Sequence, residues 1–221
     1  MSALIILTYQ SRSALLSLII GLVVLALGLT RTMRSLAKLL AATGAAALLA
    51  LLLDAVTGFG MLAKFSDPVR WTRLRLWLTA WQMFSDAPWL GQGAGSFSVL
   101  YEQYAAALRL PDWVHWDDRH MPWAHNLYLE LLAERGLLGA LCFAGWITSL
   151  ISALVRIMRN EERLRTSAAA LFAALCVVLT AGLVDLSLLR LWLVLMLTFV
   201  TAMTVVMVGC AKKQQCTFGE F

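Results

Sequence analysis

The sequence predicts an all-α membrane protein with about five transmembrane helices. Of its 221 residues, 61% are hydrophobic and only 14% are charged, whereas soluble domains carry about 25% charged residues. Apolar runs of roughly 20 residues, the length that crosses a bilayer, recur at 13–30, 36–54, 136–157, 167–185 and 190–210. A long segment, 55–135, separates the second run from the third.

Basic residues gather in the short connections between these runs and after the last one. They are Arg31, Arg34, Lys38, Arg156, Arg159, Arg163, Arg165, Lys212 and Lys213. The positive-inside rule places such stretches in the cytoplasm, so we expect segment 55–135 outside and the C-terminus inside. Because the net charge of +5 arises largely from these connections, it does not indicate a nucleic-acid partner.

The start of the chain suggests that more protein precedes it. Residues 3–8, "ALIILT", look like the tail of an earlier membrane helix, and no cleavable signal pattern precedes the first run. We therefore expect residues 1–221 to form one membrane domain that is the C-terminal part of a larger protein.

The outer segment 55–135 holds most of the nine tryptophans of the chain. They are Trp71, Trp77, Trp81, Trp89, Trp113, Trp116 and Trp123. Tryptophan favours the membrane–water interface, where its ring is buried and its N–H stays hydrated. We therefore expect this segment to lie along the membrane surface.

Within this segment, residues 70–84 predict an amphipathic helix. Its apolar residues at i, i+3, i+7 and i+10 share one helical face; they are Trp71, Leu74, Leu78 and Trp81. Arg73 lies on another face, and Asp86 and Pro88 end the helix. The following stretch 90–97, "LGQGAGSF", predicts a flexible glycine turn. It lacks the lysine and the preceding strand of a nucleotide-binding loop.

All three histidines fall in the same short region, next to two aspartates. These residues are His115, His120, His125, Asp117 and Asp118. Imidazole and carboxylate groups can bind a metal, but histidines five residues apart do not share a helical face, and Pro122 interrupts any helix there. We therefore predict no metal site and place His115 and His120 in a solvated polar loop.

His125 stands out because of the residues that follow it. Asn126 is a favourable N-cap for a helix over 127–135, and Gly136 and Gly139 allow close helix packing where the chain enters the membrane. Two interpretations of His125 remain open. It either simply precedes a cap, or it serves as a general base near neutral pH.

His125-Asn126, nine residues, Gly136, two residues and Gly139 together resemble the His-[Asn/Ser/Gln]-x9-Gly-x-x-[Gly/Thr/Tyr] signature of O-antigen ligases. Other pieces fall in the order of the same superfamily, which includes O-antigen polymerases and protein O-oligosaccharyltransferases. "SRSALL" (11–16) is similar to its Ser-Arg helix start, "RLRLW" (73–77) to its Arg-x-x-x-Trp, and "DAPWLGQGAGSF" (86–97) to its Asp-x-Pro-x-x-Gly-x-Gly. The resemblance covers essentially the whole chain.

The resemblance implies a GT-C-type glycosyltransferase of the bacterial inner membrane, with its active site facing the periplasm. Such an enzyme moves a glycan from undecaprenyl diphosphate to an acceptor hydroxyl, such as a sugar of the lipid A-core, without a metal or another cofactor. The matched positions imply that His125 is the base and that Arg12 and Arg73 bind the diphosphate, with Arg75 as a close alternative. Asp185 could help to orient the site.

Elementary chemistry agrees with these roles, because the arginine guanidinium presents a rigid fork of donors to phosphate oxygens. The alternative for Arg12, Arg73 and Arg75 is that their side chains only reach toward the membrane interface. The alternative for Asp185 is an ordinary carboxylate at a helix end.

Three other functions stay open at this point. An O-antigen polymerase or a protein O-oligosaccharyltransferase would use the same chemistry with another acceptor. A transporter or lipid-binding scaffold would place ionisable residues in the middle of its spans. Here Arg12, Asp185 and Arg190 lie near the ends of the apolar runs, which favours chemistry at the outer surface.

Overall fold

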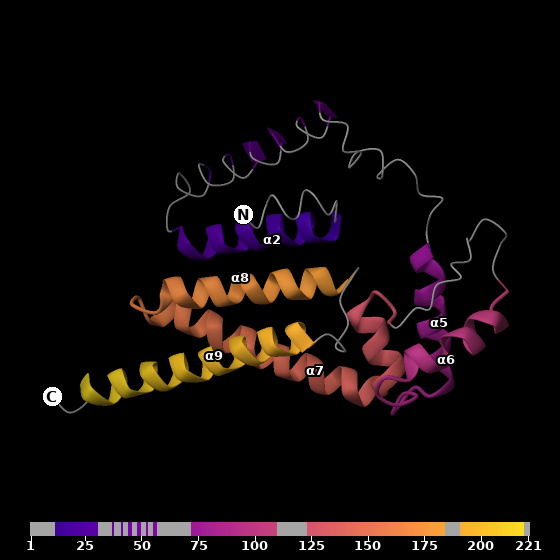
Figure 1. Cartoon of the computed structure of the whole chain (residues 1–221). Helices are drawn as coiled ribbons and strands as arrows, with labels where there is room; N and C mark the ends of the chain where they lie inside the picture. Colours follow the sequence, from indigo (N-terminus) through magenta and orange to yellow (C-terminus); the bar gives the residue numbers. More distant parts are fainter. Residues whose placement is uncertain are drawn as a thin grey trace. The chain divides into compact units, whose positions relative to one another are not determined.

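A computed structural model describes residues 12–30, 72–109, 123–183 and 191–218, together with single positions between 37 and 56. Its helices are α2 (Arg12–Leu29), α5 (Thr72–Asp86), α6 (Ser96–Ala107), α7 (Leu127–Asn160), α8 (Arg165–Gly182) and α9 (Leu191–Phe218), as labelled in Figure 1. No strand occurs among the described residues. The predicted all-α membrane fold is confirmed.

Three helices are long and apolar enough to cross a membrane, namely α7, α8 and residues Leu191–Ala211 of α9. They coincide with the last three of the predicted spans. The first predicted span corresponds to α2, which contains the shorter apolar stretch Leu16–Leu29. The single positions described within 36–54 are helical, and the rest of that predicted span lies outside the described residues.

The chain divides into two compact units, and α7 continues from one into the other. Unit 1 comprises Met1–Met61, Trp146–Thr180 and Leu195–Phe221. Unit 2 comprises Leu62–Gly145 and Ala181–Val194, and so contains most of the predicted outer segment.

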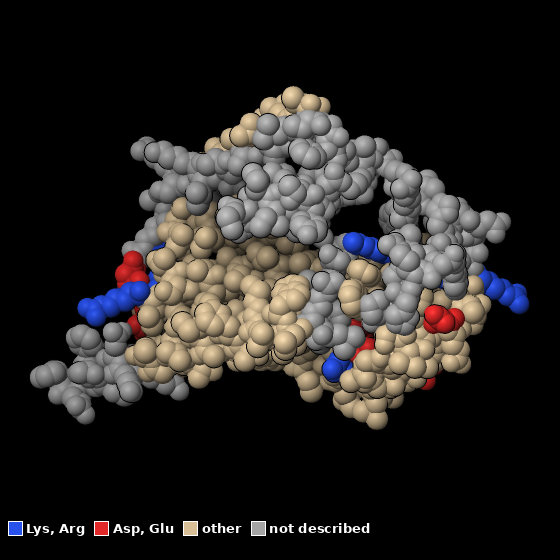
Figure 2. Space-filling model, in the orientation of Figure 1, with Lys and Arg blue, Asp and Glu red and all other residues tan. Residues whose placement is uncertain are grey.

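Small residues and apolar side chains hold the membrane helices of unit 1 together. Gly28 of α2 lies so close to α8 that a Cβ there would come within 2.8 Å of the Cβ of Ala169, the small-residue packing common between membrane helices. Arg165 Nε also donates a hydrogen bond to the carbonyl oxygen of Gly28 (3.1 Å). On α7, α8 and α9, the buried residues Leu154, Ile157, Ala168 and Met207 form one cluster. Charged groups gather at the end of unit 1 where α7 passes into α8 (Figure 2).

Unit 2 has its own hydrophobic core, formed by one face of α5 and one face of α6. The buried residues are Leu76, Ala80, Met83, Phe97, Tyr101, Ala105, Ala124 and Ala133. The spacing within each helix follows the helical repeat, and each large side chain among them contributes about 1.5–3 kcal/mol when fully buried. Ala124 precedes α7 and Ala133 belongs to it, so this core fixes the start of α7 to α5 and α6.

The face of α5 that packs in this core is not the apolar face expected from the sequence. The helix ends at Asp86, as predicted, but Leu76 and Ala80 are buried while Trp81 is 52% exposed. Leu74 and Leu78 are half-buried and share the outer face with Trp81. The helix therefore has two apolar faces. Contact of the outer face with the membrane stays a prediction.

The glycine turn between α5 and α6 was predicted to be flexible, but in the structure its backbone is hydrogen-bonded to α7. The N–H of Gln92 donates to the carbonyl of Ala133 (2.9 Å), and the N–H of Gly93 donates to that of Glu134 (2.9 Å). In the opposite direction, the N–H of Leu137 donates to the carbonyl of Pro88 (2.8 Å). The turn is thus an ordered part of unit 2.

These hydrogen bonds are made where α7 is broken, at Gly136. This residue has φ 63° and ψ −167°, so two helices, 127–135 and 137–160, meet there at a kink. A helix end leaves its last carbonyls and the next helix's first N–H groups without intrahelical partners, and the turn supplies those partners. The combination of φ and ψ at Gly136 is accessible essentially to glycine alone.

Both glycines of the signature stretch are explained by this kink. A Cβ on Gly136 would overlap the carbonyl group of Trp89 and lie 2.6 Å from the nitrogen of Gly91. A Cβ on Gly139 would collide with the side chain of Arg135, which precedes the kink. The close approach at Gly136 is therefore to the backbone of the turn, whereas the sequence had suggested helix packing.

We predict that Gly136→Ala lowers the free energy of unfolding by about 3 kcal/mol or more, because the new side chain meets both a combination of φ and ψ that only glycine adopts readily and the backbone of the turn. Gly145→Ala is the matched control in the same helix. No atom lies within 4 Å of a Cβ built on Gly145, so this change should be neutral or stabilise by up to about 1 kcal/mol. Thermal unfolding of the detergent-purified variants measures both effects. Equal midpoints would contradict this explanation of Gly136.

Candidate active site

The candidate site is built on the start of α7, where Asn126 is the N-cap, as predicted. The N–H groups of Tyr128 and Leu129 both donate to Asn126 Oδ1, each at 3.0 Å. Asn126 Nδ2 donates to the carbonyl of Leu183 (2.9 Å), next to the end of α8. The side chain therefore satisfies two otherwise unpaired N–H groups of the helix and also anchors the helix start within unit 2.

A buried glutamate holds the residue on the other side of His125. Glu130 is only 2% exposed, and its Oε2 accepts a hydrogen bond from the N–H of Ala124 (3.2 Å). Glu130 belongs to the first helix of α7, so a side chain of this helix binds the backbone of the residues that precede it. Because Asn126 is the cap, the neighbours of His125 on both sides are fixed by the same helix.

His125 itself has a strained backbone. Its φ is 52°, and it is the one non-glycine residue with a positive φ in the part of the chain that the structure describes. The left-handed conformation costs roughly 1–2 kcal/mol for a residue with a side chain. The half-buried imidazole lies beside the indole of Trp123, with ring centroids 5.7 Å apart. The surrounding contacts thus hold the backbone of His125 in a conformation that a histidine rarely adopts.

At the other end of the same helix, Glu134 joins α7 to the start of α6. Its Oε2 accepts a hydrogen bond from the N–H of Gly95 (2.9 Å), and its Oε1 accepts one from the N–H of Phe97 (3.2 Å). A carboxylate is stabilised at a helix N-terminus, where N–H groups point outward and the helix dipole is positive. Arg135 Nη1 lies 3.6 Å from Oε2. This buried charge is therefore compensated.

Glu130 and Glu134 were not recognised from the sequence. The signal was present, because two carboxylates four residues apart in "LYLELLAER" fall on one face of an otherwise apolar helix. Buried charges need hydrogen-bond partners. Those partners are N–H groups of the turn and of the residue before His125, and periodicity alone does not reveal them.

The two arginines of α5 have different surroundings. Arg75 Nη2 donates to the carbonyl of Ala105 (2.8 Å), in the last turn of α6, where carbonyls lack helical partners. Burial lowers the pKa of Arg75, and the nearby Tyr101 partly offsets this effect. Arg75 thus has a structural role at the end of α6. Arg73, two residues earlier, lies on a different face of α5 and is half-buried.

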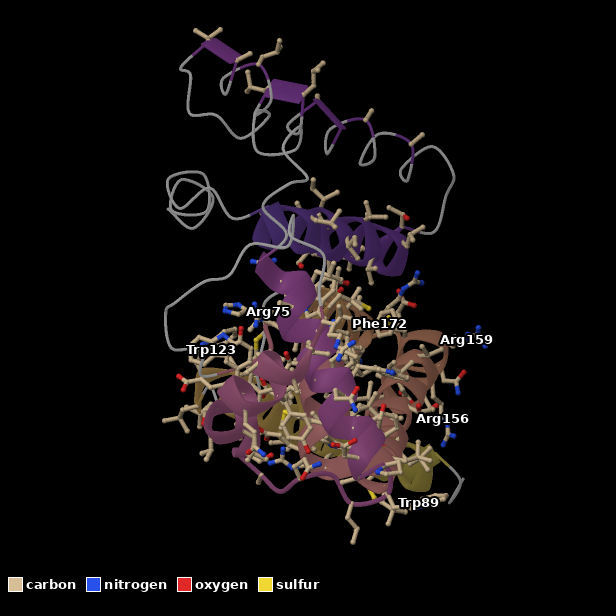
Figure 3. All side chains as sticks on the ribbon, turned by 90° about the vertical axis from the view of Figure 1, so that its right-hand side faces the viewer. Arg75, Trp89, Trp123, Arg156, Arg159 and Phe172 are labelled. Atoms are coloured by element: carbon tan, nitrogen blue, oxygen red, sulfur yellow. The ribbon has the colours of Figure 1, made fainter. Side chains whose placement is uncertain are left out.

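Unit 2 contains most of the predicted site residues. They are Arg73, Arg75, His125, Asn126, Gly136 and Gly139. In the projection of Figure 3, Arg75 and Trp123 appear toward one end of unit 2 and Trp89 toward the other. Arg12 is the first residue of α2, in unit 1, and its side chain lies outside the described residues, as does Asp185.

Of the three histidines considered above as metal ligands, His125 lies within the described residues. His115 and His120, with Asp117 and Asp118, lie outside the described residues. In the parts of the chain that are described, no group of three or more His, Cys, Asp or Glu side chains could hold a metal ion. The absence of a metal stays a prediction.

The fold defines a multipass α-helical membrane protein, and its candidate site lies within unit 2, around the start of α7. The chain belongs to the O-antigen ligase family: the model of that family, described as O-antigen ligase, matches residues 1–144. The match includes the histidine, the N-cap and both signature glycines. Neither a curated protein nor a solved structure matches the chain. Its function is therefore of the O-antigen ligase or polymerase type, that of a membrane enzyme acting on glycans.

We predict that Glu134→Gln lowers the free energy of unfolding by about 2–3 kcal/mol. The amide has one acceptor oxygen in place of two, so its NH₂ group would face the N–H of Gly95 or Phe97. Glu102→Gln, on the exposed side of α6, is the control and should change stability by less than about 0.5 kcal/mol. Thermal unfolding in detergent compares the two. A Glu134→Gln protein as stable as the control would show that the carboxylate does not stabilise the turn.

Proposed function

We propose that this protein transfers a glycan from undecaprenyl diphosphate to an acceptor hydroxyl, such as a sugar of the lipid A-core, at the periplasmic face of the bacterial inner membrane. His125 acts as the general base. Arg12 and Arg73 bind the diphosphate of the donor, and no metal or other cofactor takes part. The basic short connections support this orientation, because they place the His125 end of α7 on the outer side.

The observation that carries this proposal is the strained backbone of His125. Residues in sparsely populated conformations persist when the surrounding structure enforces them, and they cluster at active sites. Asn126 and Glu130 enforce this one. A histidine that merely preceded a cap would gain nothing from a left-handed conformation, since asparagine or glycine would fit it better. A catalytic role of the imidazole accounts for a histidine at this position.

The proposed reaction is a displacement at the anomeric carbon of the donor glycan. The neutral imidazole accepts the proton of the acceptor hydroxyl, and the oxygen of that hydroxyl forms the new glycosidic bond. The bond from the anomeric carbon to the diphosphate oxygen breaks, and undecaprenyl diphosphate leaves with the electron pair. Arginine side chains at the diphosphate stabilise the charge that develops on it.

The same residues would serve a polymerase or a protein O-oligosaccharyltransferase, which differ in the acceptor. The ligase is preferred here because the spacing from His125-Asn126 to Gly136 and Gly139 resembles the ligase signature. This spacing has a structural meaning, since it is the length of the first helix of α7.

We predict that His125→Gly separates activity from stability. Glycine removes the base, so transfer should fall by about 10²–10⁴-fold, the usual contribution of general acid–base catalysis. Stability should be unchanged or higher by up to about 1 kcal/mol, because relief of the left-handed strain offsets the entropic cost of glycine. The assay measures transfer from undecaprenyl-diphosphate-linked glycan to acceptor in membranes of cells that produce the enzyme.

Asn126→Ala is the matched comparison. It removes the N-cap and should cost about 1–2 kcal/mol of stability, and it should reduce transfer less than His125→Gly does because the base is still present. A His125→Gly enzyme that transfers glycan at the normal rate would refute the assignment of the base. Loss of transfer after treatment with EDTA would point to the three-histidine metal site.

We predict that Arg73→Lys reduces transfer by about tenfold or more at normal protein level, because lysine keeps the charge but loses the two-pronged fork that fits a phosphate. Arg109→Lys is the control. Arg109 is an exposed arginine beyond the end of α6, and its replacement should leave transfer within about twofold. Initial rates at several donor concentrations measure the effect. Equal rates in both variants would show that Arg73 does not bind the diphosphate and only reaches toward the membrane interface.

A further inference from the structure

A row of polar side chains runs along the last turns of α7. Ser149, Ser152, Arg156 and Asn160 follow one another at spacings of three or four residues, which places them on one face of the helix. All four are exposed. They belong to the end of a helix that is apolar enough to cross a membrane, where long charged side chains can reach the interface.

This polar row lines a cavity of about 410 Å³ in unit 1. Glu161 joins it on the α7 side, and Val208 and Ala211 of α9 form part of the lining. The ionisable and hydroxyl groups therefore come from α7 and from Glu161 directly after it, while α9 contributes apolar surface. A ligand that fits such a cavity has both a polar and an apolar part.

The charged groups of the cavity indicate the chemistry of the polar part. Arg156 supplies one guanidinium, which suits a phosphate group, and Glu161 supplies one carboxylate. α7 ends at Asn160, where the helix dipole and the last carbonyls are negative and favour a cation. An anion is therefore favoured at Arg156, and a cation is favoured beside it at the helix end.

The serines lie deeper in the helix than the arginine. From the helical rise of 1.5 Å per residue, Ser152 is about 6 Å and Ser149 about 10 Å further along the axis than Arg156. Ser149 Oγ already donates to the carbonyl of Trp146 (2.7 Å), which leaves Ser152 as the hydroxyl donor. In a phospholipid, the ester carbonyls lie beneath the phosphate in the same way.

We propose that this cavity binds the head group of a zwitterionic phospholipid, with its phosphate on Arg156 and its ammonium group at Glu161 and the end of α7. The Ser152 hydroxyl donates to an ester carbonyl, and the acyl chains lie along the apolar wall of α9. This site is distinct from the proposed site of glycan transfer, and neither proposal requires the other.

Arg159 allows a matched comparison. It is also an exposed arginine near the end of α7, but it does not line the cavity. Both side chains are labelled in Figure 3. If Arg156 only reached toward the interface, as charged side chains near helix ends often do, the two arginines would contribute equally to lipid binding. A head-group site requires Arg156 alone.

The test is native mass spectrometry of the delipidated protein in detergent, titrated with phosphatidylethanolamine. We expect Arg156→Gln to weaken binding of the first lipid by about tenfold or more, equivalent to about 1.4 kcal/mol, and Arg159→Gln to change it by less than about twofold. Ser152→Leu keeps every charge but fills the cavity, and it should also weaken binding. Size-exclusion elution and the unfolding midpoint establish that each variant is folded.

Competition identifies the ligand. Phosphatidylethanolamine should remain bound in the presence of equal concentrations of phosphatidylglycerol, diacylglycerol or inorganic phosphate. Displacement by phosphatidylglycerol or by inorganic phosphate would overturn the zwitterionic head group in favour of a general anion site. Equal losses in Arg156→Gln and Arg159→Gln, or full binding by Ser152→Leu, would refute the cavity as the binding site.

Discussion

The break of α7 at Gly136 is the constraint on which the described part of unit 2 depends. An interrupted helix exposes carbonyl and N–H groups that need other partners once they are buried. The turn between α5 and α6 supplies those partners, and Glu134 joins the same turn by accepting hydrogen bonds from two of its backbone N–H groups. The glycines, the turn and the buried carboxylate are therefore parts of one arrangement, and removing any of them leaves buried polar groups without partners.

The same arrangement determines the position of His125. The first helix of α7 is short and held at both ends, by Asn126 and Glu130 at its start and by Glu134 at its end. A residue placed directly before such a helix is held by contacts of unit 2 at both ends of that helix. Under the proposed function, this arrangement suits a base that must meet a lipid-linked donor in a set position, because a displacement of an ångström or so can cost much of the rate.

The spacing in the family signature acquires a physical meaning from these contacts. The nine residues between Asn126 and Gly136 are the helix that joins the cap to the kink. Inserting or removing one residue would rotate the cap by about 100° relative to the kink and separate it from Leu183. The signature thus describes the length of a structural element as much as a set of reactive groups, which is why the glycines accompany the histidine.

The sequence by itself determined the all-α membrane class, most of the spans, the N-cap at Asn126 and the end of α5, because these depend on composition, on the helical repeat and on local hydrogen bonds. It also indicated His125 through the signature. Only the tertiary structure decided which face of α5 is buried, that the glycine turn is ordered, and that Glu130 and Glu134 are paired. The turn and Glu134 depend on backbone groups far away in the chain, Glu130 depends on how the residues before α7 fold back onto it, and the buried face of α5 depends on packing against α6. A pattern of side chains carries no record of where such groups lie in space.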